Sequence, residues 1–292
     1  MSNATFPTPQ LQALIAILRG GSFEAAASEL GVTQSAISQR LQNLEERAGG
    51  ILVVRAQPCE PTELGARLAA HAEQVVLMER SLIAELGLDD AKPRLRIAVN
   101  ADSLATWFLP ALVGIDARFD IEVDDQDHSA TLLRKGEVVA AVTADGDPVQ
   151  GCDRVALGAL RYVPTASPDF ARLWFPGAVT ADALARAPVL VYNEKDGLQH
   201  AWARSMTGSA ALGPHHHMPS TTAFVEAARL GLGWGLNPET LVEPALSCGA
   251  LVDLGQGTRF ETPLFWQSAR AVKSALLPLT KAVRQVARER LT

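Results

Sequence analysis

Hydrophobic positions in the first fifty residues repeat with the period of an α-helix and predict three short helices. Over 9–21 they stand at i, i+3, i+4 and i+7, at Leu11, Leu14, Ile15 and Leu18. This first helix is expected to end at the glycines 20–21. A second helix is expected after the N-cap Ser22, and a third after the N-cap Thr33. The inward positions of the third helix are Ile37, Leu41 and Leu44.

The second and third expected helices are joined by a tight Gly31-Val32 turn, and small residues stand where they cross. This arrangement is typical of a helix-turn-helix, although an ordinary helical hairpin has the same spacing. The outward face of the third helix carries amide and hydroxyl side chains and one cation, which suit base edges and phosphates in a major groove. The candidate DNA contacts are Thr33, Gln34, Ser35, Ser38, Gln39, Arg40 and Gln42.

The stretch AAASELGVTQSAISQRLQNLEE, residues 25–46, resembles the N-terminal domain of LysR-type transcriptional regulators. That family shows two alanines, a leucine, a turn, a Ser/Thr-Gln-Ser/Pro-Ala-hydrophobic-Ser run and a Leu-Glu pair. The resemblance implies a winged helix-turn-helix over 1–64 that binds double-stranded promoter DNA. ILVVR and QPCEP fit the strand and turn of the wing, which adds Arg55 to the DNA contacts.

Residues 64–86 contain no proline and one early glycine, and they predict a single long helix. A seven-residue repeat places Leu68, Val75 and Leu82 in one row and Leu64, His71, Met78 and Glu85 in the other. By itself the repeat indicates a helix that packs on some other surface. The resemblance implies a linker and dimerisation helix over 65–92, with a homodimer or tetramer as the assembly. A dimer also supplies the two half-site readers that a helix-turn-helix needs.

After Pro93 short apolar runs alternate with helical ones. The first set comprises strands at 95–100, 119–126 and 139–144, with helices at 103–114 and 128–136. A second set covers 161–168, 179–188, 189–193, 197–206, 221–231, 234–238, 251–254 and 263–267, before a last helix at 275–291. The alternation predicts an α/β domain with a parallel sheet and crossover helices.

The resemblance implies that residues 93–292 form a two-lobed effector domain built like a periplasmic binding protein. Lobe I is expected at about 93–145 and 265–292, and lobe II at about 146–264. Ligands of such sheets bind beyond the carboxyl ends of the strands. There AVNADSLATW, residues 98–107, runs from a strand into a helix, whose free backbone amides favour an anion. Asp102 offers the opposite charge beside them, so this junction suits a ligand with a carboxylate and a cation, as in an amino acid.

The same stretch, with DDQDHSATLLRKGEVVAAVTADGDPVQGC, ALGALRYVPTASP and EAARLGLGWGLNPE, resembles the ArgP/LysG-like branch, which controls lysine and arginine export. The resemblance implies lysine or arginine as the effector and an amino-acid exporter gene as the target. Ser103 would take the carboxylate, the acids would take the cations, and Trp107 would line the aliphatic stem. Several of these acids are equally compatible with solvated loops or caps. The candidate effector contacts are Asn100, Asp102, Ser103, Leu104, Trp107, Asp125, Asp127, His128, Thr143, Tyr192, Asp196, Thr221 and Thr222.

Composition narrows the class of protein without changing this interpretation. Hydrophobic residues make up 48% of the chain and charged residues 20%, and no apolar run is long enough to span a bilayer. The net charge of −6 and the single cation on the recognition face indicate that DNA affinity depends on dimer avidity and hydrogen bonds. The first ten residues lack a secretory signal, so we expect a cytoplasmic protein with reduced cysteines and RNA polymerase as a partner.

Other motifs are weaker. GLGWG, residues 231–235, predicts a tight turn from helix to strand and not a dinucleotide loop, because the order of elements is reversed. HHHM, residues 215–218, favours surface histidines over a metal site, since neighbours in an extended segment face opposite ways. No nucleophile elbow, P-loop or metalloprotease motif is present, so we expect no enzyme and no cofactor. A transport receptor and a LysR-type regulator with a different effector are the alternatives.

Overall fold

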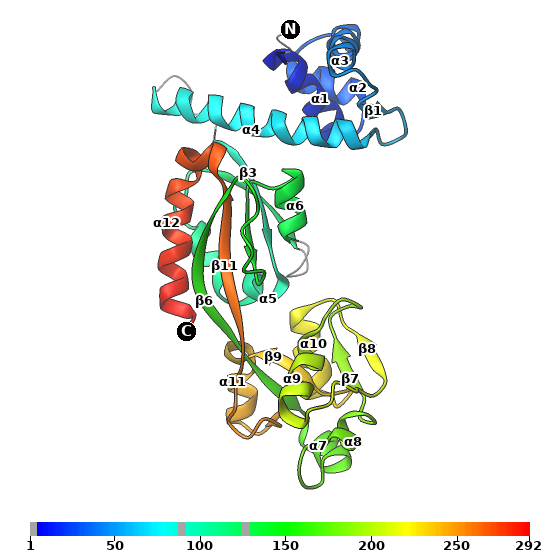
Figure 1. Cartoon of the computed structure of the whole chain (residues 1–292), viewed down its shortest axis with the longest axis vertical. Coiled ribbons are helices and arrows are strands. Elements are labelled where there is room, and N and C mark those ends of the chain that lie inside the picture. The colour runs from blue at the N-terminus through cyan, green and yellow to red at the C-terminus, as the bar shows by residue number, and fades with distance from the viewer. Residues whose placement is uncertain (1–4, 87–91, 124–128) are drawn as a thin grey trace.

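The computed structural model describes residues 5–86, 92–123 and 129–292, and it arranges them as three bodies along one axis (Figure 1). The first body contains α1 (Thr8–Gly20), α2 (Phe23–Leu30) and α3 (Gln34–Ala48). Helices α2 and α3 begin at the predicted caps, because Ser22 Oγ and Thr33 Oγ1 accept backbone amides at 3.1 and 3.2 Å. The inward residues of the three helices share one hydrophobic core, as the apolar spacing predicts.

The wing follows α3 as a small antiparallel pair of β1 (Val53–Val54) and β2 (Glu60–Pro61). The long helix α4 (Glu63–Glu85) begins directly after it. Thr62 caps this helix, since its Oγ1 accepts the amide of Gly65 at 3.0 Å. The expected winged helix-turn-helix and long linker helix are therefore both present.

The two rows of the seven-residue repeat on α4 have different surroundings. Leu68 and Val75 pack into the core shared with α1, so these two positions of the expected pairing seam are used within the chain. Leu77 points the other way and joins the core of the effector domain. The exposed apolar residues of α4 and of the turn after it are Leu64, Met78, Leu82 and Leu86. The helix is thus held by both neighbouring bodies and keeps an apolar surface of its own.

The main sheet has the strand order β10-β6-β11-β5-β3-β4, with β9 on β6. The strands are β3 (Arg94–Val99), β4 (Arg118–Val123), β5 (Ala140–Thr143), β6 (Cys152–Ala166), β9 (Gly235–Pro238), β10 (Val252–Asp253) and β11 (Phe260–Ala269). Strands β3, β4 and β5, with the adjoining parts of β6 and β11, belong to the middle body, lobe I, whereas β9 and β10 pair with the far end of β6 in lobe II. Strands β4 and β5 run parallel to β3, as predicted. The prediction of a parallel sheet is wrong for the others, which pair antiparallel because β6 leaves lobe I and β11 returns to it.

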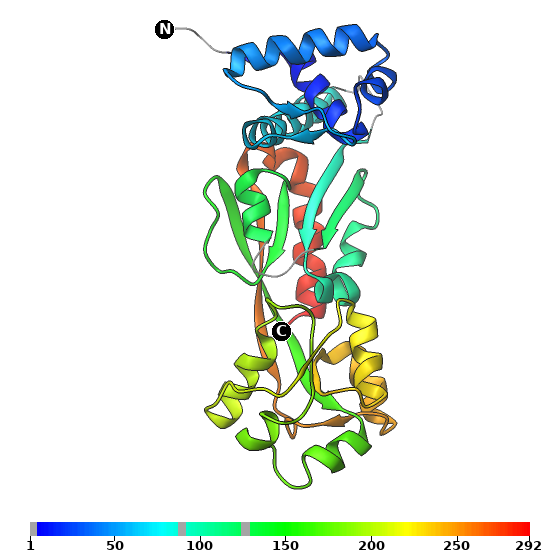
Figure 2. The ribbon, with the colours of Figure 1, turned by 90° about the vertical axis from the view of Figure 1, so that its right-hand side faces the viewer.

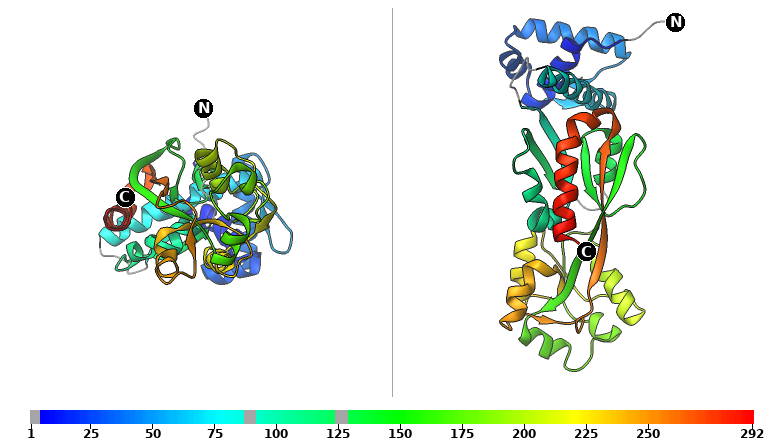
Figure 3. Two further views of the ribbon diagram at one scale, coloured as in Figure 1. Left: turned by 90° about the horizontal axis from the view of Figure 1, so that it is seen from below. Right: turned by 90° about the vertical axis from the view of Figure 1, so that its left-hand side faces the viewer.

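The helices of lobe I cover this sheet. They are α5 (Ala101–Ser103), α6 (Ser129–Lys135) and α12 (Lys273–Arg290), with the short helical turns η1 (Leu104–Phe108), η2 (Leu109–Leu112) and η3 (Arg270–Val272). Helix α12 lies along lobe I (Figure 3). The helix expected at 103–114 begins two residues earlier than predicted and then divides into a π-helical and a 3₁₀ turn. Pro110, which has no amide hydrogen to donate, lies in the second of these turns.

Lobe II lies beyond lobe I, and among the described strands β6 and β11 run continuously through both (Figure 2). Besides β9 and β10, its elements are α7 (Pro168–Trp174), α8 (Ala181–Leu184), β7 (Val189–Val191), α9 (Leu198–Thr207), β8 (His215–His217), α10 (Thr221–Arg229) and α11 (Glu239–Ser247). Helices α7 and α11 and strand β8 were not predicted. The start of β6 pairs with the end of β11 beside β5, so the expected boundary at 145–146 precedes the crossing. The pairing of β11 with β6 contains a β-bulge between Leu264 and Phe265.

Two further findings concern metals and membranes. His215–His217 pair with β7 and are exposed or half-buried, and no group of His, Cys, Asp or Glu in the described ranges is placed to hold a metal. No helix among the described residues is both long and apolar enough to cross a membrane.

Candidate functional site

A cavity of about 350 Å³ lies between the two lobes, at the carboxyl end of β3. Five of the expected effector residues line it, from the β3-to-α5 junction of lobe I and, in lobe II, from the loop between β7 and α9 and the start of α10. These are Asn100, Asp102, Tyr192, Asp196 and Thr221. The location agrees with the expected position of a ligand in such a sheet.

The other expected residues that the structure describes do not line this cavity. Ser103 and Thr143 are buried, Leu104 packs against the core and Thr222 is exposed. Trp107 is 2% exposed and packs edge to face on Phe108 in lobe I, with ring centroids 5.6 Å apart. Asp125, Asp127 and His128 lie outside the described residues. The apolar walls come instead from residues such as Phe224, Leu236 and Phe260.

Asp102 connects the two lobes through its carboxylate. Thr221, the first residue of α10 in lobe II, donates its hydroxyl to Oδ1 at 2.8 Å. Tyr162 on β6 donates its hydroxyl to Oδ2, also at 2.8 Å. Burial raises the pKa of Asp102, as does the negative charge of Asp196, while the two hydroxyl donors lower it. A cation placed in the cavity would therefore stabilise the charged form of the Asp102 carboxyl group.

The turn before Asp102 is formed by Asn100, which caps α5. Its Oδ1 accepts the amide of Ser103 at 2.7 Å. That amide, expected from the sequence to receive a ligand carboxylate, is therefore already bonded within the chain. The other end of the same side chain, Nδ2, is buried at the cavity and has no hydrogen-bond partner in the described structure.

Four buried polar atoms of the cavity residues lack a partner among the described residues. They are Asn100 Nδ2, Gln199 Oε1, Asn237 Oδ1 and Thr262 Oγ1. Buried polar groups are nearly always hydrogen-bonded, so this group indicates a place for a polar ligand or for water. The set offers both donors and acceptors. The sequence analysis missed Gln199, Asn237 and Thr262, and the only local signal was a polar residue within the apolar run WGLNP.

The other acids of the cavity are held differently from Asp102. Asp196 accepts the backbone amides of Tyr192 at 2.8 Å and Leu198 at 3.1 Å, so it orders the loop before α9. Glu261 forms an ion pair with Arg161 at 3.1 Å. Asp102, by contrast, is bonded only to neutral hydroxyl groups within the part of the chain that the structure describes. It is the acid best placed to bind a ligand cation.

The expected DNA contacts lie on the N-terminal body and are exposed or half-buried. The side chains of Gln39 and Gln42 reach one turn along α3, to Asn43 and Glu46 at 3.0 and 3.1 Å. In the wing, the Arg55 guanidinium lies 5.0 Å from the centre of the Phe23 ring. This cation–π contact holds the arginine beside the start of α2.

Comparison with known proteins identifies the family. A model described as "Bacterial regulatory helix-turn-helix protein, lysR family" matches residues 8–66, and one described as "LysR substrate binding domain" matches residues 88–291. The chain belongs to the LysR family. The resemblance stated from residues 25–46, and the fold that it implied, are confirmed.

The similar proteins of this LysR-family chain are named transcriptional regulators and not enzymes. The regulator LysG of Mycobacterium tuberculosis is 43% identical over 282 residues, covering 96% of this chain and 93% of the relative. The crystal structure of ArgP from the same organism superposes with a TM-score of 0.86 at 42% identity, covering 97% and 98% of the two chains. Full-length LysG from Corynebacterium glutamicum, solved with its effector arginine, gives 0.73 at 37% identity, covering 98% and 99%.

Proposed function

We propose that this chain is a transcriptional regulator whose effector is a basic amino acid, lysine or arginine, bound between the lobes. The observation that carries the proposal is Asp102, a carboxylate at the interlobe cavity bonded only to two neutral hydroxyls within the described residues. The arginine bound to the similar protein from C. glutamicum supports the same class of ligand. A regulator that responds to a different small molecule is the alternative.

The cavity supplies partners for both ends of an amino acid. The side-chain cation of the ligand would contact Asp102, and the ligand carboxylate would use donors such as Asn100 Nδ2 and Thr262 Oγ1. The volume of about 350 Å³ is within the range of about 300–1,000 Å³ for small-molecule sites. A guanidinium binds a carboxylate through a planar fork and an ammonium binds it as a point charge, so arginine and lysine would bind with different geometry.

The effector would act by differential affinity for two arrangements of the lobes. Helix α4 packs both on α1 and on lobe I, so it would carry a change in lobe I to the DNA-reading helices. The exposed apolar residues on and just after α4, Leu64, Met78, Leu82 and Leu86, would pair two such chains, as homodimer or tetramer, to read two half-sites. We further propose that the regulator acts in the cytoplasm with RNA polymerase at the promoter of an amino-acid exporter gene.

A calorimetric panel tests the effector class. The full-length protein is titrated with arginine, lysine, histidine, leucine and glutamate. We expect arginine or lysine to bind, and leucine and glutamate to give no heat of binding, because neither carries a side-chain cation for the acidic cavity. Silence toward every basic amino acid, in a protein that still binds promoter DNA, would favour the alternative of a different effector.

The proposed DNA face makes a separate prediction. Gln39→Ala removes an exposed amide from α3 and is expected to reduce the preference for operator over random DNA, since a bidentate base contact contributes roughly 1–3 kcal/mol of discrimination. The matched control is Gln285→Ala on α12, because Gln285 makes the same kind of one-turn contact, to Glu289 at 3.2 Å. Competition binding with labelled operator measures the ratio, and an unchanged ratio in Gln39→Ala would contradict the assignment.

A further inference from the structure

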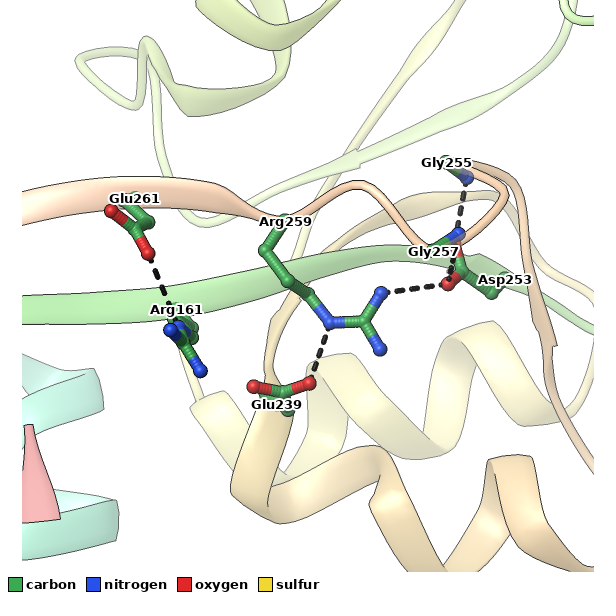
Figure 4. A network of polar contacts seen from close by, with 7 residues as sticks. All are labelled: Arg161, Glu239, Asp253, Gly255, Gly257, Arg259 and Glu261. Carbon is green, nitrogen blue, oxygen red and sulfur yellow. Dashed lines mark hydrogen bonds and ion pairs between the residues drawn. The ribbon is translucent and has the colours of Figure 1, made fainter. Parts of the chain in front are cut away.

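Arg259 joins two chain segments in lobe II. Its Nε donates to Glu239 Oε1 at 2.5 Å and its Nη1 donates to Asp253 Oδ2 at 2.8 Å (Figure 4). Asp253 also accepts the backbone amides of Gly255 at 2.7 Å and Gly257 at 3.1 Å. One guanidinium therefore fixes the start of α11 to the turn between β10 and β11.

The ion pairs span β6 at the position of Tyr162. In the sheet, Tyr162 pairs with Pro238 of β9 on one side and with Phe260 of β11 on the other. Glu239 directly follows Pro238, and Arg259 directly precedes Phe260. The Arg259–Glu239 contact thus ties together the two strands that flank the residue whose hydroxyl binds Asp102.

The same two strands carry unpartnered atoms of the cavity. Asn237, two residues before Glu239, and Thr262, three residues after Arg259, each line the cavity with a buried polar atom that lacks a partner in the described structure. A shift of either strand would move these atoms relative to Tyr162 and Asp102. Hydrogen bonds depend steeply on distance and angle, so such a shift would weaken ligand contacts.

The Arg259 guanidinium neutralises two carboxylates that lie close together. The three side chains of this cluster are only 22–29% exposed, whereas Arg172 and Asp169 on α7 are 73% and 86% exposed. Without the guanidinium, two half-buried carboxylates would face the same space with no shared cation, and their repulsion is screened less than at the open surface. The flanking strands would then separate.

We infer that Arg259 is a positioning residue of the effector site, which sets the spacing of the β9 and β11 walls around Tyr162. This inference rests on the proposed function. It assigns to Arg259 no contact with the ligand, since its guanidinium is bonded to Glu239 and Asp253.

The test compares Arg259→Gln with Arg172→Gln in the full-length protein. Arg172→Gln makes the same chemical change, but at the Arg172–Asp169 ion pair on α7, which is far more exposed than the cluster around Arg259. We expect Arg259→Gln to lower arginine affinity by about tenfold, the size of effect typical of residues that couple to a site without contacting its ligand. We expect operator affinity to stay close to that of Arg172→Gln, whereas the melting temperature should fall further than in Arg172→Gln, because the lost ion pairs are less exposed. Arg259→Lys, which can keep one ion pair, should restore part of the arginine affinity.

Hydrogen exchange gives a readout that needs no ligand. Faster exchange is expected at the amides of Leu236, Asn237 and Phe260 in Arg259→Gln and not in Arg172→Gln. Unchanged arginine affinity and unchanged exchange in Arg259→Gln would overturn the inference while leaving the proposed function intact. If the unmodified protein binds no basic amino acid, the proposed function fails, and the exchange comparison alone decides whether Arg259 positions these strands.

Discussion

Asp102→Asn is expected to lower the affinity for arginine by a factor of roughly 30 to 1,000, because losing one partner of a desolvated charge pair costs about 2–4 kcal/mol. The substitution keeps the size of the side chain and removes its negative charge. Thr221 and Tyr162 donate to different oxygens of the carboxylate, so one of them can still donate to the amide oxygen and the hydroxyl of the other can accept from the amide nitrogen. Calorimetric titration with arginine measures the loss.

A pair of threonine variants provides the control for this result. Thr221→Val removes a donor to Asp102, whereas Thr222→Val makes the same change at the next, exposed position. We expect Thr221→Val to change arginine affinity and Thr222→Val to leave it unaltered. If Asp102→Asn bound arginine as tightly as the unmodified protein, the ligand cation would not be held by Asp102.

The second large effect expected is that effector affinity rises with pH. Burial raises the pKa of Asp102 in the free protein. A bound cation favours the charged carboxylate and lowers that pKa again, so binding releases a proton from molecules in which Asp102 is protonated. Affinity should therefore increase by up to about tenfold per pH unit below the free-protein pKa and become constant above it. The side chains of arginine and lysine keep their charge throughout this range.

Titrations in buffers with different ionisation enthalpies detect the released proton directly. The Asp102→Asn variant is the control, because its amide cannot titrate, and its residual binding should lose this pH dependence. A flat pH profile in the unmodified protein, together with a binding heat that does not depend on the buffer, would contradict a cation bound by Asp102.

The sequence correctly predicted those elements that are determined by residues close together along the chain. The caps Ser22, Thr33 and Thr62, the three short helices and the long helix follow from local hydrogen bonds and apolar spacing, and the structure contains them. Asp102 could be found for the same reason, since it stands where a buried strand gives way to a helix. The family resemblance added the wing and the two-lobed arrangement, which the spacing alone does not specify.

What the sequence missed depends on contacts between distant segments. Trp107 has helical spacing that suits either a cavity wall or the core, and it is buried in one hydrophobic core with residues of β11 and α12. Gln199, Asn237 and Thr262 reach one cavity only because β9 and β11 both pair with β6, while α9 lies beside them. The antiparallel strands were missed because the direction of β6 and β11 follows from the crossing between lobes.

The central claim is that a basic amino acid binds between the lobes and that its side-chain cation contacts the Asp102 carboxylate. A crystal structure of the full-length protein with arginine tests it most directly. The account predicts the ligand in the cavity lined by Asn100, Asp102 and Thr221, with a ligand nitrogen within hydrogen-bond distance of the Asp102 carboxylate. Arginine bound elsewhere, or bound in this cavity with its carboxylate and not its cation toward Asp102, would contradict the account.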